Sequence, residues 1–200
     1  GGGTDLGPTP DAGPSMCAAL AVVTGCDGTE RTVMGRTYCV HVPPGYHDGT
    51  PIPVVMMLHG YTATGAIQSA YLGLNHVADV RNFLLVKPDG LLDSLGQHYW
   101  NASPACCAMF ATTPPDDVAY LSAVLDDVES AYSVDTHREY VMGHSNGAFM
   151  TQRMACEHGD RFAAAVSLAG GADLDCTPGT AVPFLEVHGD ADATILYGGG

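Results

Sequence analysis

A serine between two glycines is the feature of this sequence that is most directly suited to chemistry. Residues Gly143 to Gly147 read Gly-His-Ser-Asn-Gly and fit the pattern G-x-S-x-G, in which a sharp turn from a strand into a helix lifts a serine oxygen into a cleft. The serine backbone is strained there, and side chains in place of the glycines would collide with the adjacent strand and helix. We therefore predict that Ser145 is a nucleophile for acyl transfer. The competing interpretation is a glycine-rich turn in which Ser145 only caps the next helix.

A serine hydroxyl needs two further groups before it can attack an acyl carbon. A histidine must take its proton, and a carboxylate must orient that histidine. With a serine on this kind of turn the chain order is serine, acid, histidine, and the acid lies in a loop after a later strand. Asp192 has that position and is the predicted acid, with Asp190 in the same loop as the alternative. No histidine follows Asp192, so we expect the base beyond Gly200; His98 is the upstream histidine whose loop could best reach the cleft.

Two backbone N–H groups are candidates for stabilising the negative oxygen that forms when an acyl carbon is attacked. The apolar run Ile52 to Leu58 is followed by His59-Gly60-Tyr61, and a loop placed in this way after a strand supplies one such donor. We predict the N–H of Tyr61 as that donor and the N–H of Asn146 as the second. His59 is expected to have a structural role.

The elements that must position these residues are visible as short apolar runs that alternate with segments of helical spacing. Runs with the length of strands cover Arg36 to Pro43, Ile52 to Leu58, Phe83 to Val86, Glu139 to Met142, Phe162 to Leu168 and Pro183 to Val187. Apolar residues at helical spacing cover Thr64 to Val80, Asp116 to Tyr132 and Asn146 to His158. Strands that alternate with helices form a mainly parallel sheet with helices on both faces. The sequence therefore predicts an α/β fold.

One long segment does not fit this alternation. It runs from Gly90 to Pro115 and holds the single tryptophan, Trp100, and the adjacent cysteines Cys106 and Cys107. Long irregular segments in a compact domain tend to be functional or cross-linked. Trp100 is therefore a candidate substrate-binding residue in the wall of a cleft, and the alternative is a lid over the core.

Length and charge limit the class of protein. Two hundred residues with 46% apolar composition suit one domain, which we expect over residues 15–200 after a Gly- and Pro-rich flexible tether at residues 1–14. A net charge of −15 argues against nucleic acid or an anionic membrane as partner. The longest apolar runs fall short of the roughly 18 residues of a transmembrane helix. Nucleotide and zinc motifs are absent from the sequence, so we expect neither a metal nor an organic cofactor.

Seven cysteines are many for a cytosolic enzyme of this size. None forms a C-x-x-C pair, so we predict disulfides in an exported protein, with one thiol left over. The alternative is free buried thiols in a cytoplasmic protein. The chain begins at Gly1, and its Gly/Thr/Asp/Pro leader is similar to those that follow the lipid-bearing cysteine of bacterial lipoproteins. We therefore expect a bacterial protein that is secreted, periplasmic or on the cell surface, with a possible lipid anchor upstream of Gly1.

Seven motifs in order resemble the polyhydroxybutyrate depolymerase-type esterases, which are grouped with feruloyl and acetylxylan esterases in the α/β-hydrolase superfamily. The resemblance extends over nearly everything from Gly35 onward. The motifs are LHGYTATG at Leu58 to Gly65, KPDG at Lys87 to Gly90, YWNASPACC at Tyr99 to Cys107, DDVAYL at Asp116 to Leu121, GHSNGAFM at Gly143 to Met150, RMAC at Arg153 to Cys156 and HGDADATILYGG at His188 to Gly199.

This resemblance implies a secreted α/β-hydrolase that cleaves carboxylic esters, small or polymeric, through an acyl-enzyme and without a cofactor. Carried over by position, it implies that Ser145 is the nucleophile, Asp192 the acid, and Tyr61 and Asn146 the oxyanion donors. It also implies that the two adjacent cysteines bridge to Cys156 and Cys176, in an undecided pairing. We further expect a monomer.

The resemblance also implies that something follows the chain. Family members continue past the segment that matches Tyr197 to Gly199, and their triad histidine lies in that continuation. The chain is therefore expected to be C-terminally incomplete, with the last part of the fold missing and little or no turnover by itself. Two other functions stay open, namely a serine peptidase of the prolyl-oligopeptidase type and a non-catalytic binding domain on a hydrolase shell.

Overall fold

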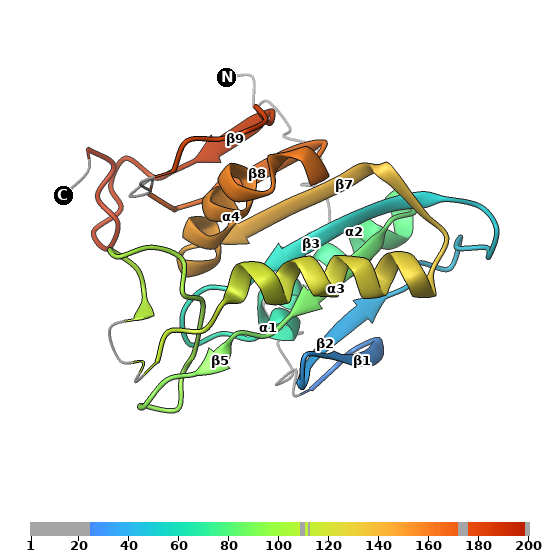
Figure 1. Cartoon of the computed structure of the whole chain (residues 1–200), viewed down its shortest axis with the longest axis horizontal. Helices are drawn as coiled ribbons and strands as arrows, with labels where there is room; N and C mark the ends of the chain where they lie inside the picture. Colours follow the sequence, from blue (N-terminus) through green and yellow to red (C-terminus); the bar gives the residue numbers. More distant parts are fainter. Residues whose placement is uncertain (1–24, 109–110, 112, 172–175, 199–200) are drawn as a thin grey trace, which may run out of the picture.

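A sheet of seven strands is the centre of the molecule. The computed structural model describes residues 25–108, 111, 113–171 and 176–198, so the predicted tether at residues 1–14 lies outside the described part. The strand order is β1-β2-β4-β3-β7-β8-β9 (Figure 1). The strands are β1 (Thr29–Val33), β2 (Arg36–His41), β3 (Ile52–Leu58), β4 (Leu84–Pro88), β7 (Val134–His144), β8 (Ala164–Leu168) and β9 (Phe184–Val187).

Strand direction brings the predicted site residues to one edge of this sheet. Strand β2 pairs antiparallel with β1 on one side and with β4 on the other. The other five strands are mutually parallel, in the order β4, β3, β7, β8 and β9. The mainly parallel sheet is therefore confirmed. Parallel strands end at a common edge, where α/β folds place their ligands. The loops after β3, β7 and β9 carry Tyr61, Ser145 and Asp192 to that edge.

Helices cover both faces of the sheet, as predicted. The helices are α1 (Gly65–Leu72), α2 (Leu74–Arg81), α3 (Asp117–Ala131) and α4 (Asn146–Glu157), with a short 3-10 turn, η3 (Gly159–Arg161). One continuous helix was expected where α1 and α2 lie. Gly73 separates them because its left-handed backbone, with φ 66°, ends α1, a conformation that favours glycine.

The alternation of side chains along β3 shows how the two layers form. Val54 and Met56 pack in the main core, which includes side chains of α3 and α4. Met57 points the other way, into a smaller cluster with Ala78 of α2 and Leu85. A strand with apolar side chains in both directions must be covered twice. The continuous apolar run in the sequence is therefore explained by helices on opposite faces.

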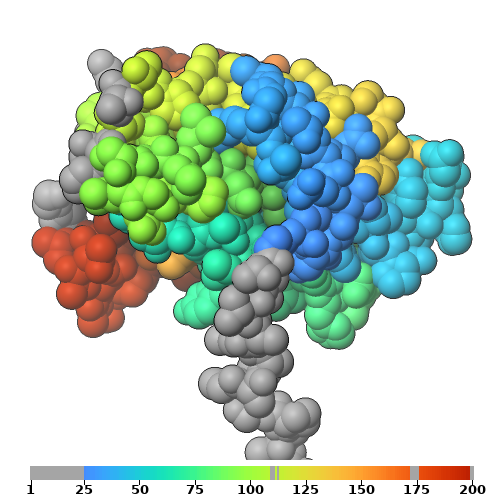
Figure 2. Space-filling view, turned by 90° about the horizontal axis from the view of Figure 1, so that it is seen from below, coloured from blue at the N-terminus to red at the C-terminus, as the bar shows by residue number. Residues whose placement is uncertain are grey.

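Within the described residues, no further strand pairs with the C-terminal end of the sheet. The strand β9 is the edge of the sheet, and its side chains Phe184, Leu185 and Val187 are 43%, 56% and 46% exposed. In register, Leu185 is aligned with Val166 of β8, so both point away from the face on which α4 packs. Figure 2 shows this C-terminal segment, in red, projecting at one side of the molecule. An incomplete fold is consistent with this bare edge.

The long segment before Pro115 is more ordered than expected, because β5 (Leu91–Leu92) and β6 (His98–Tyr99) form a small antiparallel hairpin. Its cysteines also pair differently from the family resemblance. Cys106 is bonded to Cys107, and Cys156 to Cys176, whose Cα atoms lie 6.3 Å apart, a normal disulfide separation. A third bond joins Cys26 to Cys39. The seventh cysteine, Cys17, lies outside the described residues.

Candidate active site

Ser145 occupies the turn between β7 and α4 in a strained conformation. Its backbone has φ 53° and ψ −120°, a region that non-glycine residues rarely adopt and that clusters at functional sites. Its side chain accepts no capping hydrogen bond from α4, whereas a helix cap has an extended backbone and such a bond. The capping interpretation therefore does not describe this residue.

The flanking glycines are needed for the close approach that the sequence predicted. A Cβ atom at Gly143 would overlap the carbonyl of Gly147, and a Cβ atom at Gly147 would overlap the carbonyl groups of Leu58 and His59. The turn is therefore pressed against the end of β3. Gly60 lies on the other side of the turn at a looser distance, since an ideal Cβ there would lie 3.3 Å from Nδ1 of His144 and 3.5 Å from the Cβ of Ser145.

Two backbone N–H groups beside Ser145 remain available. Within the described residues, neither the N–H of Tyr61 nor that of Asn146 donates to a protein acceptor. Asn146 is the first residue of α4, where the helix dipole also favours negative charge. The Tyr61 hydroxyl points elsewhere and donates to Asp93 Oδ2 at 2.6 Å. One predicted donor thus follows Gly60, which lies against Ser145, and the other directly follows Ser145 in the chain.

Asp192 is held by its own loop. Its Oδ1 accepts from the N–H of Thr194 at 2.8 Å and of Ile195 at 3.0 Å. These N–H groups, that of Ile195 first, lower the pKa of Asp192, so the carboxylate is charged at neutral pH. The other oxygen, Oδ2, lies 3.6 Å from Nε2 of His188. Asp190 is exposed and makes no hydrogen bond within the described residues, which makes Asp192 the better-supported acid of the two.

No histidine nitrogen among the described residues hydrogen-bonds the Ser145 hydroxyl. His98 directs Nδ1 to the carbonyl oxygen of Gly90 at 2.6 Å. His144 lies beside Gln68, with 3.2 Å between Nδ1 and Oε1, and burial lowers its pKa. His188 directs Nε2 to the carbonyl oxygen of Ile195 at 2.7 Å. The upstream stand-in considered for the base, His98, is therefore already occupied by a backbone partner.

His59 is a structural residue in this geometry. It is fully buried, and its Nε2 accepts from the N–H of Gly90 at 2.9 Å, so its Nδ1 carries the proton toward the carbonyl oxygen of Gly60 at 2.8 Å. Burial lowers the pKa of His59 to about 4. Its imidazole is consequently neutral near pH 7.

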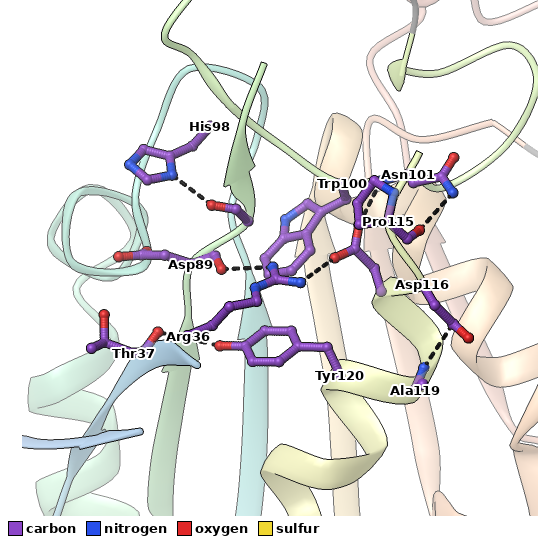
Figure 3. Close-up of polar contacts among 12 residues, drawn as sticks. Arg36, Thr37, Asp89, His98, Trp100, Asn101, Pro115, Asp116, Ala119 and Tyr120 are labelled. Atoms are coloured by element: carbon purple, nitrogen blue, oxygen red, sulfur yellow. Dashed lines mark hydrogen bonds and ion pairs between the residues drawn. The ribbon is translucent and has the colours of Figure 1, made fainter. Parts of the chain in front are cut away.

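Trp100 does not line an open cleft. Its side chain has no exposed surface, and its indole packs on His59 with 4.9 Å between ring centres. The guanidinium of Arg36 lies 5.8 Å from the ring centre of Trp100 and 3.5 Å from the ring centre of Tyr120 (Figure 3). Of the two interpretations of Trp100, burial favours the lid over the core. No feature of the sequence pointed to the buried partners Arg36 and Tyr120.

Comparisons with known proteins agree on one family. The model of a family described as "Putative esterase" matches residues 30–183. The chain is 31% identical to "Putative esterase NocK" of Nocardia uniformis subsp. tsuyamanensis over 99% of this chain and 61% of that protein. It is 27% identical to feruloyl esterase C of Emericella nidulans over 84% of this chain and 59% of that protein. It is 33% identical to poly(3-hydroxyalkanoate) depolymerase C of Paucimonas lemoignei over 66% of this chain and 30% of that protein.

Solved structures agree on the fold. A thermostable esterase superposes with a TM-score of 0.67 at 19% identity, over 86% of this chain and 49% of that one. The acetyl xylan esterase of Aspergillus awamori superposes with a TM-score of 0.53 at 20% identity, over 72% of this chain and 52% of that one. The chain thus spans about three fifths or less of the length of these five proteins. It has the α/β-hydrolase fold and belongs to the esterase family whose model matches residues 30–183.

Proposed function

We propose that the whole protein that carries this chain hydrolyses carboxylic esters through an acyl-enzyme on Ser145. The observation that carries the proposal is the strained serine at the start of α4, with the free N–H groups of Tyr61 and Asn146 beside it. The names of the relatives, which include a feruloyl esterase and a polyhydroxyalkanoate depolymerase, support an ester as the substrate.

The proposed reaction assigns one task to each residue. The Oγ of Ser145 bonds to the ester carbonyl carbon while a base takes its proton, and the carbonyl oxygen becomes negative. The N–H groups of Tyr61 and Asn146 stabilise that oxygen. The alcohol then leaves with the proton, and water releases the acid from the serine. Asp192 orients the base and stabilises its charged form.

The base itself is proposed to come from outside these 200 residues. Three observations support this: no histidine follows Asp192, the sheet is bare at β9, and relatives are longer than this chain. The 200-residue chain by itself is accordingly expected to show little or no turnover. Removing triad members can leave some catalysis by the oxyanion donors.

The surroundings of the protein are part of the same proposal. Three disulfides support an oxidising compartment and hence export from the cell. None of the described helices has the length and apolar character to cross a bilayer. We propose a secreted or periplasmic monomer whose substrate is a feruloyl-type, polyester or short-chain ester.

The test compares the full-length protein with Ser145→Ala. We expect hydrolysis of p-nitrophenyl butyrate by the wild type, with a burst of p-nitrophenol, and loss of about 10⁵-fold or more in Ser145→Ala, as for other nucleophile deletions. Ser130→Ala, on the exposed side of α3, is the matched control. Faster cleavage of peptide p-nitroanilides than of esters would favour the peptidase alternative. Absence of both activities and of fluorophosphonate labelling would favour a binding domain and contradict the proposal.

A further inference from the structure

The side chain of Asn146 is not free to contact a substrate. It is fully buried, and its Oδ1 accepts from the backbone N–H of Trp100 at 2.7 Å. Its Nδ2 donates to the backbone carbonyl of Trp100 at 3.0 Å and to Sγ of Cys106 at 3.4 Å. The amide therefore pairs with residue 100 in both directions, and α4 is tied at its first residue to the segment after β6.

Trp100 passes this connection on to the loop after β3. Its indole Nε1 donates to the carbonyl oxygen of His59 at 3.0 Å, and its ring packs on the His59 imidazole. One residue thus contacts both the helix that begins with Asn146 and the loop that contains Tyr61. Both contacts are fully buried, where hydrogen bonds are stronger than in water and are costly to leave unmade.

The imidazole of His59 completes the connection. Its Nδ1–H donates to the carbonyl oxygen of Gly60, and this carbonyl shares a peptide unit with the N–H of Tyr61. Because a peptide unit is planar, holding the oxygen on one side fixes the direction of the N–H on the other. Hydrogen bonds, joined by the covalent frames of Trp100 and His59 and by the Gly60–Tyr61 peptide unit, therefore connect the Asn146 side chain to the Tyr61 N–H. The N–H of Ala63 also holds the Gly60 carbonyl, at 3.1 Å.

Trp100 is itself firmly held, as Figure 3 shows. The next residue, Asn101, donates its N–H to Asp117 Oδ2 at 2.8 Å. Asp117 also binds Arg36 through Oδ1 at 2.7 Å, and Arg36 reaches the carbonyl oxygen of Asp89 at 2.9 Å. The residue that links the two donor segments is thus fixed to β2, to the end of β4 and to α3.

We propose that Trp100 and the Asn146 side chain are positioning residues that hold the two oxyanion donors at a fixed separation. The proposal rests on the proposed ester hydrolysis and deepens it. Asn146 then has two separate tasks, because its backbone N–H faces the reacting oxygen and its side chain sets where that N–H lies. Trp100 does not touch the substrate in this proposal, and it acts on the reaction only through its hydrogen bonds.

The test uses two variants of the full-length protein that keep both donor N–H groups. Asn146→Ala removes the side-chain amide but leaves the backbone N–H. Trp100→Phe keeps a buried ring and removes the N–H that binds the His59 carbonyl. We expect kcat to fall about 10- to 100-fold in each, with KM changed less than about threefold, because a displaced donor weakens the transition state more than the bound substrate.

A matched control removes the same kind of bond without touching this chain. Tyr120 donates its hydroxyl to the Thr37 carbonyl at 3.2 Å and is buried beside Trp100. Tyr120→Phe therefore deletes one hydrogen bond from an aromatic side chain to a backbone carbonyl. Its kcat should stay within about twofold of the wild-type value, whatever the change in Tm. A purely structural role for Trp100 would make its variant behave like this control.

A second readout does not need turnover. Phenylboronic acid forms a tetrahedral adduct with a serine hydroxyl and places a negative oxygen among the donors, so its Kd should rise about tenfold or more in both variants, as expected for a mimic of the transition state. Trp100→Phe and Asn146→Ala should also be non-additive, because they break one chain. If the wild type hydrolyses esters or binds the boronate and both variants match it, this proposal is wrong although the proposed function stands. If the wild type does neither, both proposals fall.

Discussion

The two halves of the candidate site differ in how closely the surrounding backbone packs against them. The serine half lies between β3, β7 and α4, where each flanking glycine meets backbone atoms and Asn146 is fully buried. The acid half lies after β9, an exposed edge strand, and Gly189 in its loop has nothing closer than 4.0 Å to an added Cβ. The proposed nucleophile is thus packed against described backbone, whereas the loop of the proposed acid is open around Gly189.

Among substitutions that keep Ser145, the largest effect should come from the exposed half, through charge and not through packing. In the full-length protein, Asp192→Asn keeps an oxygen for the N–H groups of Thr194 and Ile195 but loses the negative charge that stabilises a protonated base. We expect kcat for p-nitrophenyl butyrate to fall by about 10⁴-fold. Asp190→Asn is the control and should lose less than about threefold. A larger loss in Asp190→Asn than in Asp192→Asn would exchange their roles.

Stability should be most sensitive to added side-chain atoms in the serine half. Gly147→Ala places a Cβ atom on the carbonyl groups of Leu58 and His59, which are backbone and cannot swing aside. We expect a loss of about 3 kcal/mol or more in the free energy of unfolding, measured by urea denaturation. Gly189→Ala, in the exposed half, should change it by less than about 0.5 kcal/mol. Similar values for both glycines would remove the contrast between the halves.

A pH-dependent term is also expected near the serine half. Glu139 of β7 is buried, and burial together with the nearby Glu129 carboxylate raises its pKa to about 8. The folded state therefore keeps a proton that the unfolded state releases at lower pH. This contribution to stability is complete below the ordinary pKa of glutamate and is lost as the pH rises toward and through 8, with a slope of at most about 1.4 kcal/mol per pH unit.

The variant Glu139→Gln tests this sign. Its amide resembles the protonated carboxyl, so the decline in unfolding free energy between pH 5 and 8 should be flatter than in the wild type by about one proton's slope. Glu157→Gln, in an exposed pair with Arg153, serves as control and should leave the decline unchanged. An unchanged decline in Glu139→Gln would show that the carboxyl is charged in the folded protein over this pH range.

The smallest effect is expected at the edge strand. In the 200-residue chain Leu185→Ala should change the free energy of unfolding by less than about 0.5 kcal/mol, because the side chain is mostly exposed. Leu85→Ala, in fully buried β4, should cost about 2–5 kcal/mol. In the full-length protein the two values should converge if further chain covers β9. A value for Leu185→Ala that stays small there would show that the edge is bare in the complete molecule as well.

The sequence predicted the parts of the fold that depend on burial. Strands β3 and β4 are continuous apolar runs; β3 was predicted with its observed ends, and β4 with errors of one and two residues. β1 was missed because Thr29, Glu30 and Arg31 are polar and lie at the exposed edge. β7 begins at Val134, five residues before the apolar run, because its first half is polar and largely exposed. Hydrophobic periodicity therefore identifies buried strands and misses polar strand segments at the exposed edges of the sheet.

The candidate site also has a part that the sequence predicted and a part that it did not. The placement of Ser145 followed from a motif whose glycines have a steric reason. The task of the Asn146 side chain had no sequence signal, because its partner Trp100 is distant in the chain and the contact is to backbone atoms, which any residue type possesses. The adjacent cysteines could suggest cross-linking but could not give the pairing, which depends on tertiary distances.

The exposed edge at β9 has one more consequence. A strand with a partner on one side only presents a row of N–H and C=O groups, and such a row accepts an added strand from another polypeptide. Among the described residues, the open side of β9 is therefore the place where a strand from a second polypeptide could pair with this sheet. If such a pairing completed the proposed site, colour released from an ester substrate would report that the second polypeptide had bound.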